Sequence, residues 1–173
     1  MAVKLKLKHL LFLSALGSPI ANAGAYIALA PALIHIKTDD GSTKPFVTDL
    51  RLGYAYESHK VELTTMSSIS NDNLNQLETD VPAAAALFYR YTIKPKSSLS
   101  VDVILGYSQI DIDFKDPMTP LTTETFEGVS FGVGLEEALK SIPQLKFKLD
   151  LIQLYRGDRL NINSLSLGLR YEF

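Results

Sequence analysis

Apolar and polar side chains alternate with a period of two residues along most of the chain, and this feature most constrains the fold. In 46–57, Leu50 and Leu52 share one face, and Asp49 and Arg51 share the other. A β-strand produces this pattern because its successive side chains point to opposite sides. The recurring pattern predicts eight strands, at 26–36, 46–57, 61–65, 81–93, 99–107, 129–135, 145–151 and 165–173.

The first 23 residues have the layout of a cleaved secretory signal peptide. Three lysines precede the apolar run 10–16, and Ala21 and Ala23 supply small residues at the two positions that a signal peptidase reads. A retained membrane anchor is the alternative, but the run is far shorter than the ~20 apolar residues of a spanning helix. The sequence therefore predicts a signal peptide at 1–23 and one mature domain at 24–173.

Composition narrows the function classes. With 173 residues, 46% of them hydrophobic and 21% charged, the chain can form one folded domain. It contains no cysteine, which excludes disulfides and cysteine-based metal or redox sites. Removal of the three signal lysines leaves 14 basic against 19 acidic residues, so no clustered positive charge favours nucleic acid.

The connections between the predicted strands alternate in length. The first, third, fifth and seventh are long and polar, at 37–45, 68–80, 111–124 and 155–163. The second and fourth are tight, at 57–60 and 94–97, and the sixth, around 137–143, is slightly longer. An up-and-down meander explains this alternation, because it places all long loops at one end and all short turns at the other.

Two features distinguish a membrane barrel from a soluble ligand-binding barrel. The polar face carries many small residues, among them Gly53, Gly134 and Gly168, which suit the crowded inside of a narrow barrel. Aromatic residues of the apolar face gather near the strand ends, as in the two girdles of a membrane barrel. They are Tyr54, Tyr56, Tyr89, Tyr91, Tyr171 and Phe173 toward the short turns, and Phe46, Tyr107 and Tyr155 toward the loops.

The predicted fold is therefore all-β, an eight-stranded antiparallel up-and-down transmembrane β-barrel in the outer membrane. The first strand is apolar on both faces, so its facing stays open. The last strand carries aromatic rings into the chain terminus, with a polar residue and a glycine before them. Ser166, Gly168, Tyr171 and Phe173 match the C-terminal targeting signal of outer-membrane barrels position by position.

With these residues the chain resembles the small eight-stranded outer-membrane β-barrel proteins of Gram-negative bacteria, namely OmpA-like transmembrane domains and opacity-type surface proteins. The likeness covers the mature chain in layout and is sharpest at 132–152 and 163–173. It implies export, insertion by the barrel-assembly machinery, a monomer surrounded by lipid and lipopolysaccharide, and a host or surface ligand for the loops. The sequence ends at the eighth strand, so no peptidoglycan-binding domain is expected to follow.

Few residues suggest chemistry. Some small membrane barrels modify lipid A with Ser, His and an acid, but His35 is expected at the loop rim and His59 in a short turn. Asp39, Asp40, Asp111, Asp113 and Asp116 could bind a divalent cation, although a solvated acidic loop is the commoner case. The tripeptide 156–158, Arg-Gly-Asp, is ordinary turn chemistry as well as an integrin motif. We assign no catalytic residue, metal or cofactor.

Charged residues on the polar face are predicted to fill the barrel interior. Eight strands enclose a space that side chains can just fill, and unpaired charges there would be costly. We expect Arg51, Arg90 and Arg170 to pair with carboxylates across the lumen. The interior charges are Asp49, Arg51, Glu62, Arg90, Asp102, Glu136, Lys146, Lys148, Asp150, Arg170 and Glu172. The sequence thus favours a structural or surface-interaction protein, with a lipid A-modifying enzyme or a narrow channel as alternatives.

Overall fold

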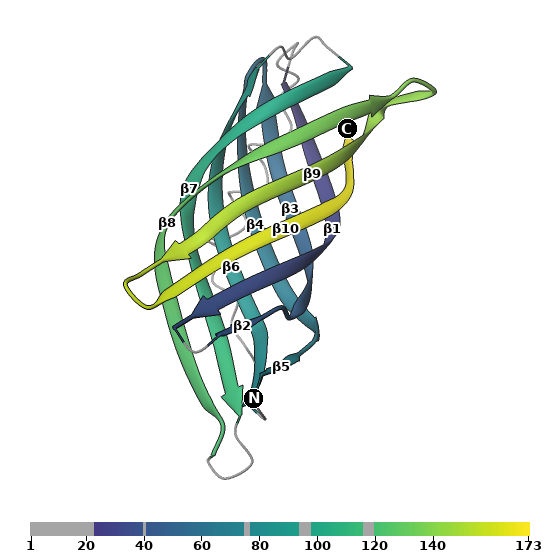
Figure 1. Cartoon of the computed structure of the whole chain (residues 1–173). Coiled ribbons are helices and arrows are strands. Elements are labelled where there is room, and N and C mark those ends of the chain that lie inside the picture. Colours follow the sequence, from purple (N-terminus) through teal and green to yellow (C-terminus); the bar gives the residue numbers. More distant parts are fainter. Residues whose placement is uncertain (1–22, 40, 75–76, 94–97, 116–119) are drawn as a thin grey trace, which may run out of the picture.

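The computed structural model describes residues 23–39, 41–74, 77–93, 98–115 and 120–173 (Figure 1). Within them, no helix is long and apolar enough to cross a membrane. The predicted signal peptide, apart from Ala23, lies outside the described residues. The strands are β1 (Ala23–Thr38), β2 (Gly41–Thr43), β3 (Phe46–Tyr56), β4 (His59–Ser70), β5 (Asp72–Leu74), β6 (Leu77–Ile93), β7 (Leu99–Lys115), β8 (Thr122–Leu139), β9 (Ile142–Arg156) and β10 (Leu160–Glu172).

Eight long strands close into one antiparallel barrel. Around the wall the order is β1, β3, β4, β6, β7, β8, β9 and β10, and β10 pairs with β1 to complete the ring. Figure 1 shows this closure as the purple and yellow ribbons lying side by side. The predicted strands and meander order are confirmed. The sequence does not predict β2 and β5, which pair with β1 and β6 inside the first and third connections.

The alternation along each strand separates an inner from an outer surface. On β3, Asp49 and Arg51 are buried, whereas Leu50 and Leu52 are exposed. The same division holds on the other long strands, so a band of Leu, Val, Ile and Tyr encircles the outside of the barrel. Such a band is what contact with lipid requires.

The facing of β1 follows from the space inside the barrel. Its inward side chains are Tyr26, Ala28, Ala30, Ala32, Ile34 and Ile36, all of them buried. The Tyr26 ring lies over Gly53, directly across the β1–β3 pair, and occupies the place that a Cβ there would need. Alanines inward and Ile27 and Leu29 outward therefore fit a narrow lumen surrounded by lipid.

Three of the four long connections are shorter than the sequence predicts, and one aromatic residue faces the other way. The connections predicted at 68–80 and 111–124 shrink to 71–76 and 116–121. The predicted long connection at 155–163 is only the turn 157–159, because β9 continues to Arg156 and β10 begins at Leu160. A shift of register between Ile162 and Asn163 brings Tyr155 opposite the buried Ile162. Tyr155 therefore packs inward against Phe126, with ring centroids 5.5 Å apart, and is not part of the outer girdle.

Candidate functional site: the barrel interior and its two ends

Arg90 is the centre of the charged layer inside the barrel. It projects from β6 and donates to three carboxylates: Nη1 to Glu62 at 2.9 Å, Nε to Asp102 at 2.9 Å and Nη2 to Asp150 at 2.6 Å. All four side chains are at most 1% exposed. Buried charges are tolerated only when they are paired and hydrogen-bonded in this way.

Arg51 and Lys148 complete this central layer. Arg51 binds Asp49 on its own strand, and its Nη1 donates to Asp150 on β9 at 2.5 Å. Lys148 Nζ donates to Glu62 at 2.6 Å. Glu62 also accepts the hydroxyl of Tyr26 at 3.0 Å, so one carboxylate joins residues of four strands.

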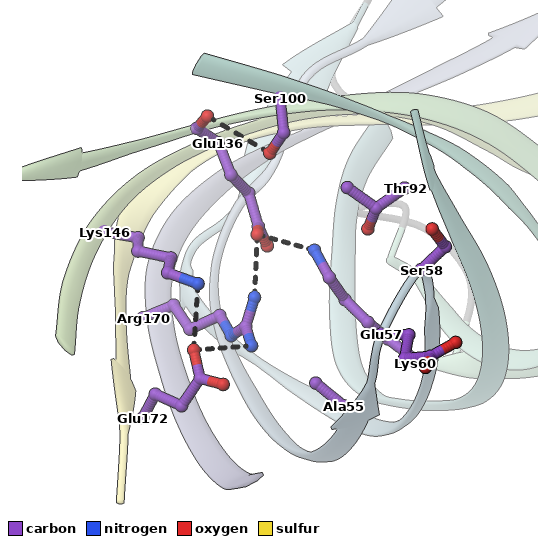
Figure 2. Close-up of a pocket in the computed structure, with 10 residues that line it drawn as sticks. All are labelled: Ala55, Glu57, Ser58, Lys60, Thr92, Ser100, Glu136, Lys146, Arg170 and Glu172. Carbon is purple, nitrogen blue, oxygen red and sulfur yellow. Dashed lines mark hydrogen bonds and ion pairs between the residues drawn. The ribbon is translucent and has the colours of Figure 1, made fainter. Parts of the chain in front are cut away.

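A second group of charges lies at the short-turn end. Lys60 Nζ and Arg170 Nη1 donate to Glu136 Oε2 at 2.6 and 2.7 Å. Lys146 Nζ donates to Glu172 Oε2 at 2.8 Å. Figure 2 shows these five side chains around a cavity of about 540 Å³. Lys146 and Glu172 are about a quarter exposed, so they form the rim of this end of the barrel.

The described interior network contains six basic and six acidic side chains. Eleven of these residues are predicted from the sequence to face the interior, and the twelfth is Lys60. The pattern of the sequence predicts a turn at 57–60, but β4 begins at His59 and carries Lys60 inward. Its parity with Glu62 and Thr64 is the signal that could have identified it. The basic members are Arg51, Lys60, Arg90, Lys146, Lys148 and Arg170; the acidic ones are Asp49, Glu62, Asp102, Glu136, Asp150 and Glu172.

Toward the loop end, apolar side chains take over the interior. This second layer has at its core Ile34, Ile36, Val47, Met66, Val81, Phe88, Ile104, Ile110, Ile112, Ile152, Leu154 and Ile162. The sequence predicts that an ion-pair network fills the lumen, and the apolar layer shows that this prediction is incomplete. Near the loop end of β7 the inward side chains are apolar and the outward ones are charged, with Ile110 and Ile112 buried and Asp111 and Asp113 facing out. This part of the wall lies on the loop side of the apolar band, beyond the lipid tails.

The two histidines of the described residues lie on the outer side of the barrel. His35 is opposite Asn163 on the outer face of β1, and His59 Nδ1 lies 2.6 Å from the hydroxyl of Tyr89. Neither ring is hydrogen-bonded to a serine or a carboxylate in the described part of the chain. The geometry therefore does not assemble the Ser-His-acid arrangement of a lipid A-modifying enzyme from these residues.

The loop-end acids are engaged with neighbouring hydroxyl groups. Asp111 accepts from Thr125 at 2.7 Å, and Asp113 accepts from Thr123 at 2.6 Å. Asp40 and Asp116 lie outside the described residues. Among the residues that are described, no three His, Asp or Glu side chains are grouped to hold a metal ion.

Three residues of the predicted assembly signal lie on β10, on both of its faces, and Phe173 directly follows the strand. Ser166 and Gly168 point inward, where Arg51 Nη2 donates to Ser166 Oγ at 3.2 Å. Tyr171 and Phe173 point outward, with ring centroids 5.4 Å apart and planes at 80°. The backbone N–H of Phe173 donates to the carbonyl of Ala25 at 3.0 Å, so the last residue is tied to β1.

A filled barrel of eight strands with an apolar outer band agrees with the comparison to known families. The family model described as outer membrane protein beta-barrel domain matches residues 9–173. The chain belongs to this family. The barrel is thus an outer-membrane protein, with its apolar band against lipid. No curated protein matches the chain.

Solved structures of the same fold show how far the likeness extends. Ail of Yersinia pestis, crystallised with the heparin analogue sucrose octasulfate, has a TM-score of 0.64 at 14% identity, covering 88% of this chain and 99% of that one. Neisserial surface protein A has a TM-score of 0.64 at 16% identity, with the same coverage. The N-terminal barrel of Pseudomonas aeruginosa OprF has 0.59 at 12%, covering 86% and 97%. At these identities the likeness concerns the fold alone.

Proposed function

We propose that this barrel is a structural or surface-interaction protein whose function lies in its extracellular loops. The observation that carries the proposal is the filled interior, in which a charged layer and an apolar layer follow one another along the lumen. Side chains in these layers bind one another, which leaves the loops as the part of the molecule free to meet a partner. Loops on a rigid barrel are a common place for such binding residues.

The loop end is built as a surface, which supports this proposal. The first and third connections are joined because the Lys44 N–H donates to Asp72 Oδ2 at 2.6 Å. The β7–β8 hairpin extends beyond the neighbouring strands at the lower end of Figure 1. Ail and Neisserial surface protein A carry surface or attachment roles in their names. Because those likenesses show only the fold, they support the class of function and not a ligand.

Export and assembly belong to the same proposal. Residues 1–23 direct secretion and are removed, the barrel-assembly machinery reads Ser166, Gly168, Tyr171 and Phe173, and the mature chain 24–173 is a monomer. Short turns then face the periplasm and long loops face outward, as in other bacterial outer-membrane barrels. The protein needs no cofactor and is not an enzyme.

Trimmed loops test the proposal while sparing the wall. In the trimmed variant, one Asn-Gly turn replaces residues 115–121 and a second replaces residues 73–78. Each turn links two residues that are already paired across the hairpin, Phe114 with Thr122 and Asp72 with Thr79. We expect the same amount of heat-modifiable barrel in the outer membrane, with loss of attachment of producing cells to surfaces or to other cells. Unchanged attachment by the trimmed variant would contradict a role for these loops.

His35→Ala tests the enzyme alternative separately. His35 is expected to be dispensable, so lipid A from cells making this variant should have the same mass spectrum as lipid A from cells making the parent. A lipid A species that requires the parent protein and His35 would replace the binding proposal by an enzymatic one.

A further inference from the structure

A polar surface lies on the outside of the barrel where the wall closes. Two rows of outward side chains cross β2, β1, β10 and β9 in register. They follow directly from the strand pairing. The row nearer the loop end, called the upper row, consists of Ser42, Lys37, Asn161 and Arg156. The row nearer the short turns, called the lower row, consists of His35, Asn163 and Gln153. We call these seven side chains the seam patch. Their neighbours Ile34, Ile36 and Ile162 are fully buried, which fixes the patch on the outer face.

The seam patch begins where the apolar band ends. The next row toward the short turns is Leu33, Leu165 and Leu151, which are paired in the same register. Leu165 and Leu151 are 47% and 54% exposed, as expected of side chains that contact acyl chains. A lipid beside this part of the wall would have its tails against the leucines and its headgroup against the seam patch.

The chemistry of the upper row suits an anion with several oxygens. Lys37 and Arg156 flank Asn161, and two strand spacings of about 4.8 Å separate their backbones. Side chains this close can donate to one phosphate, and charge-assisted bonds from Lys and Arg are among the strongest that proteins make to phosphate. Amides and an imidazole in the lower row add neutral hydrogen-bonding groups.

A hollow in the surface adjoins the same residues. It has a volume of about 470 Å³ and is lined by His35, Lys37, Thr38, Asp39, Gly41 and Ser42. The first loop therefore forms a shallow, open hollow beside β1 against which a headgroup can lie. Asp39 is the one acidic residue of this lining and Lys37 the one basic residue, so the hollow itself is neutral and the positive charge of the patch comes from Lys37 together with Arg156.

Acidic side chains lie at the same end on the outer face of β6, β7 and β8. Asp80, Asp113 and Thr123 form one outward row across these strands, and Gln109 and Glu127 face each other further toward the short turns, with β8 directly beside β9. A phosphate would be repelled by these carboxylates. At the level of the lipid headgroups, an anion is therefore favoured beside β1 and β10 over β6 and β7.

From this arrangement we infer that the seam patch binds the phosphate of a lipid in the outer leaflet, with the acyl chains of that lipid on the leucine row. The chemical class is a phosphorylated glycolipid of the lipid A type, since this is the phosphate-bearing lipid that surrounds the loop end of an outer-membrane barrel. The inference depends on the loops facing outward and not on what the loops themselves bind, so the trimmed-loop experiment and this one can fail independently.

Native mass spectrometry of the detergent-solubilised barrel tests the inference with defined lipids. The probes are diphosphoryl lipid A, dephosphorylated lipid A and dioleoylphosphatidylglycerol. We expect the parent to bind diphosphoryl lipid A more tightly than the other two. In Lys37→Gln/Arg156→Gln, the affinity for diphosphoryl lipid A should fall about tenfold or more, because two charge-assisted hydrogen bonds are lost.

Lys115→Gln is the matched control, since it removes a basic charge from the loop end outside the seam patch. It should leave lipid affinity unchanged. Asn161→Leu provides a second test without any change in charge, and should weaken binding of diphosphoryl lipid A selectively. Equal affinity of the parent for phosphorylated and dephosphorylated lipid A, an equal loss in Lys115→Gln, or competition by inorganic phosphate that removes the preference for lipid, would overturn the inference.

Discussion

At the scale of single residues, the buried charges of the barrel interior are sensitive to the loss of one partner. Replacement of Arg90 by Met would leave Glu62, Asp102 and Asp150 each short of a donor inside the barrel. We expect a loss of about 3–5 kcal/mol in the free energy of unfolding, the usual cost of breaking one side of a buried ion pair. Urea unfolding in lipid vesicles measures it. Lys115→Met, in the exposed pair with Glu78, should cost less than about 1 kcal/mol. Similar losses for both variants would argue against a buried network.

Glycines facing the lumen provide a second test at this scale. A Cβ on Gly134 would overlap Arg90 Nη2 and Asp150 Oδ1, whereas one on Gly128 would only touch the Tyr155 ring, at 3.4 Å. Gly134→Ala is therefore expected to destabilise the barrel by about 1–3 kcal/mol through overpacking. Gly128→Ala, an inward glycine of the same strand, should be close to neutral. Urea unfolding in lipid vesicles measures the stability of both variants. Equal stability of the two would mean that Arg90 and Asp150 move apart at little cost.

Among the connecting elements, the β3–β4 turn is held in a conformation that its sequence does not favour. Glu57 has a φ of 53°, in the left-handed region. A residue with a Cβ loses roughly 1–2 kcal/mol there, while glycine loses roughly 0.5–1 kcal/mol of chain entropy on folding. Glu57→Gly should therefore stabilise the barrel by up to about 1 kcal/mol, and Glu57→Val should destabilise it. Thermal unfolding of the three proteins gives the order, and a Val variant as stable as the parent would be inconsistent with this turn.

The last strand provides a prediction about assembly. Phe173 is 78% exposed and ends the aromatic girdle beside Tyr171. If the assembly machinery reads this ring, Phe173→Ser should leave the signal peptide processed but reduce the folded barrel in the membrane fraction. Leu121→Ser, which removes an exposed apolar side chain from a loop, is the control and should assemble normally. Heat-modifiable mobility on gels reports the folded fraction, and equal fractions for both variants would exclude a special role for Phe173.

The sequence predicts the strands of the barrel better than it predicts where each strand begins and ends. Period-two alternation identifies all eight strands, because lipid outside and a packed lumen inside impose opposite polarities. The prediction fails on the loop side of the apolar band. There water surrounds the barrel, so outward side chains are polar and inward ones are apolar, as at Asp111 and Ile110. There the apolar layer and the inward Tyr155 go unrecognised. The network residues follow from parity, but their partners depend on strand stagger, which no single strand encodes.

For the whole molecule, a filled lumen has a measurable electrical consequence. Charged side chains occupy one part of the interior and apolar side chains the other, so neither a wide aqueous path nor a continuous polar one remains for ions. We expect no steady porin-sized current from the purified protein in planar bilayers, with a 16-stranded porin as the positive control. Reproducible currents of that size would show an open interior and would favour the channel alternative.

The bond between the Phe173 N–H and the Ala25 carbonyl joins the first and last strands of the barrel, which are far apart in the order of synthesis. β1 emerges first, yet its pairing edge is filled only by β10, which emerges last. Contacts between segments so distant in sequence form slowly, and an unpaired edge can recruit other chains in the meantime. If the first strands folded while the rest of the chain was still being synthesised, the edge of β1 that pairs with β10 would stay unpaired. The chain should therefore travel unfolded and escorted to the membrane, and close there in one late step.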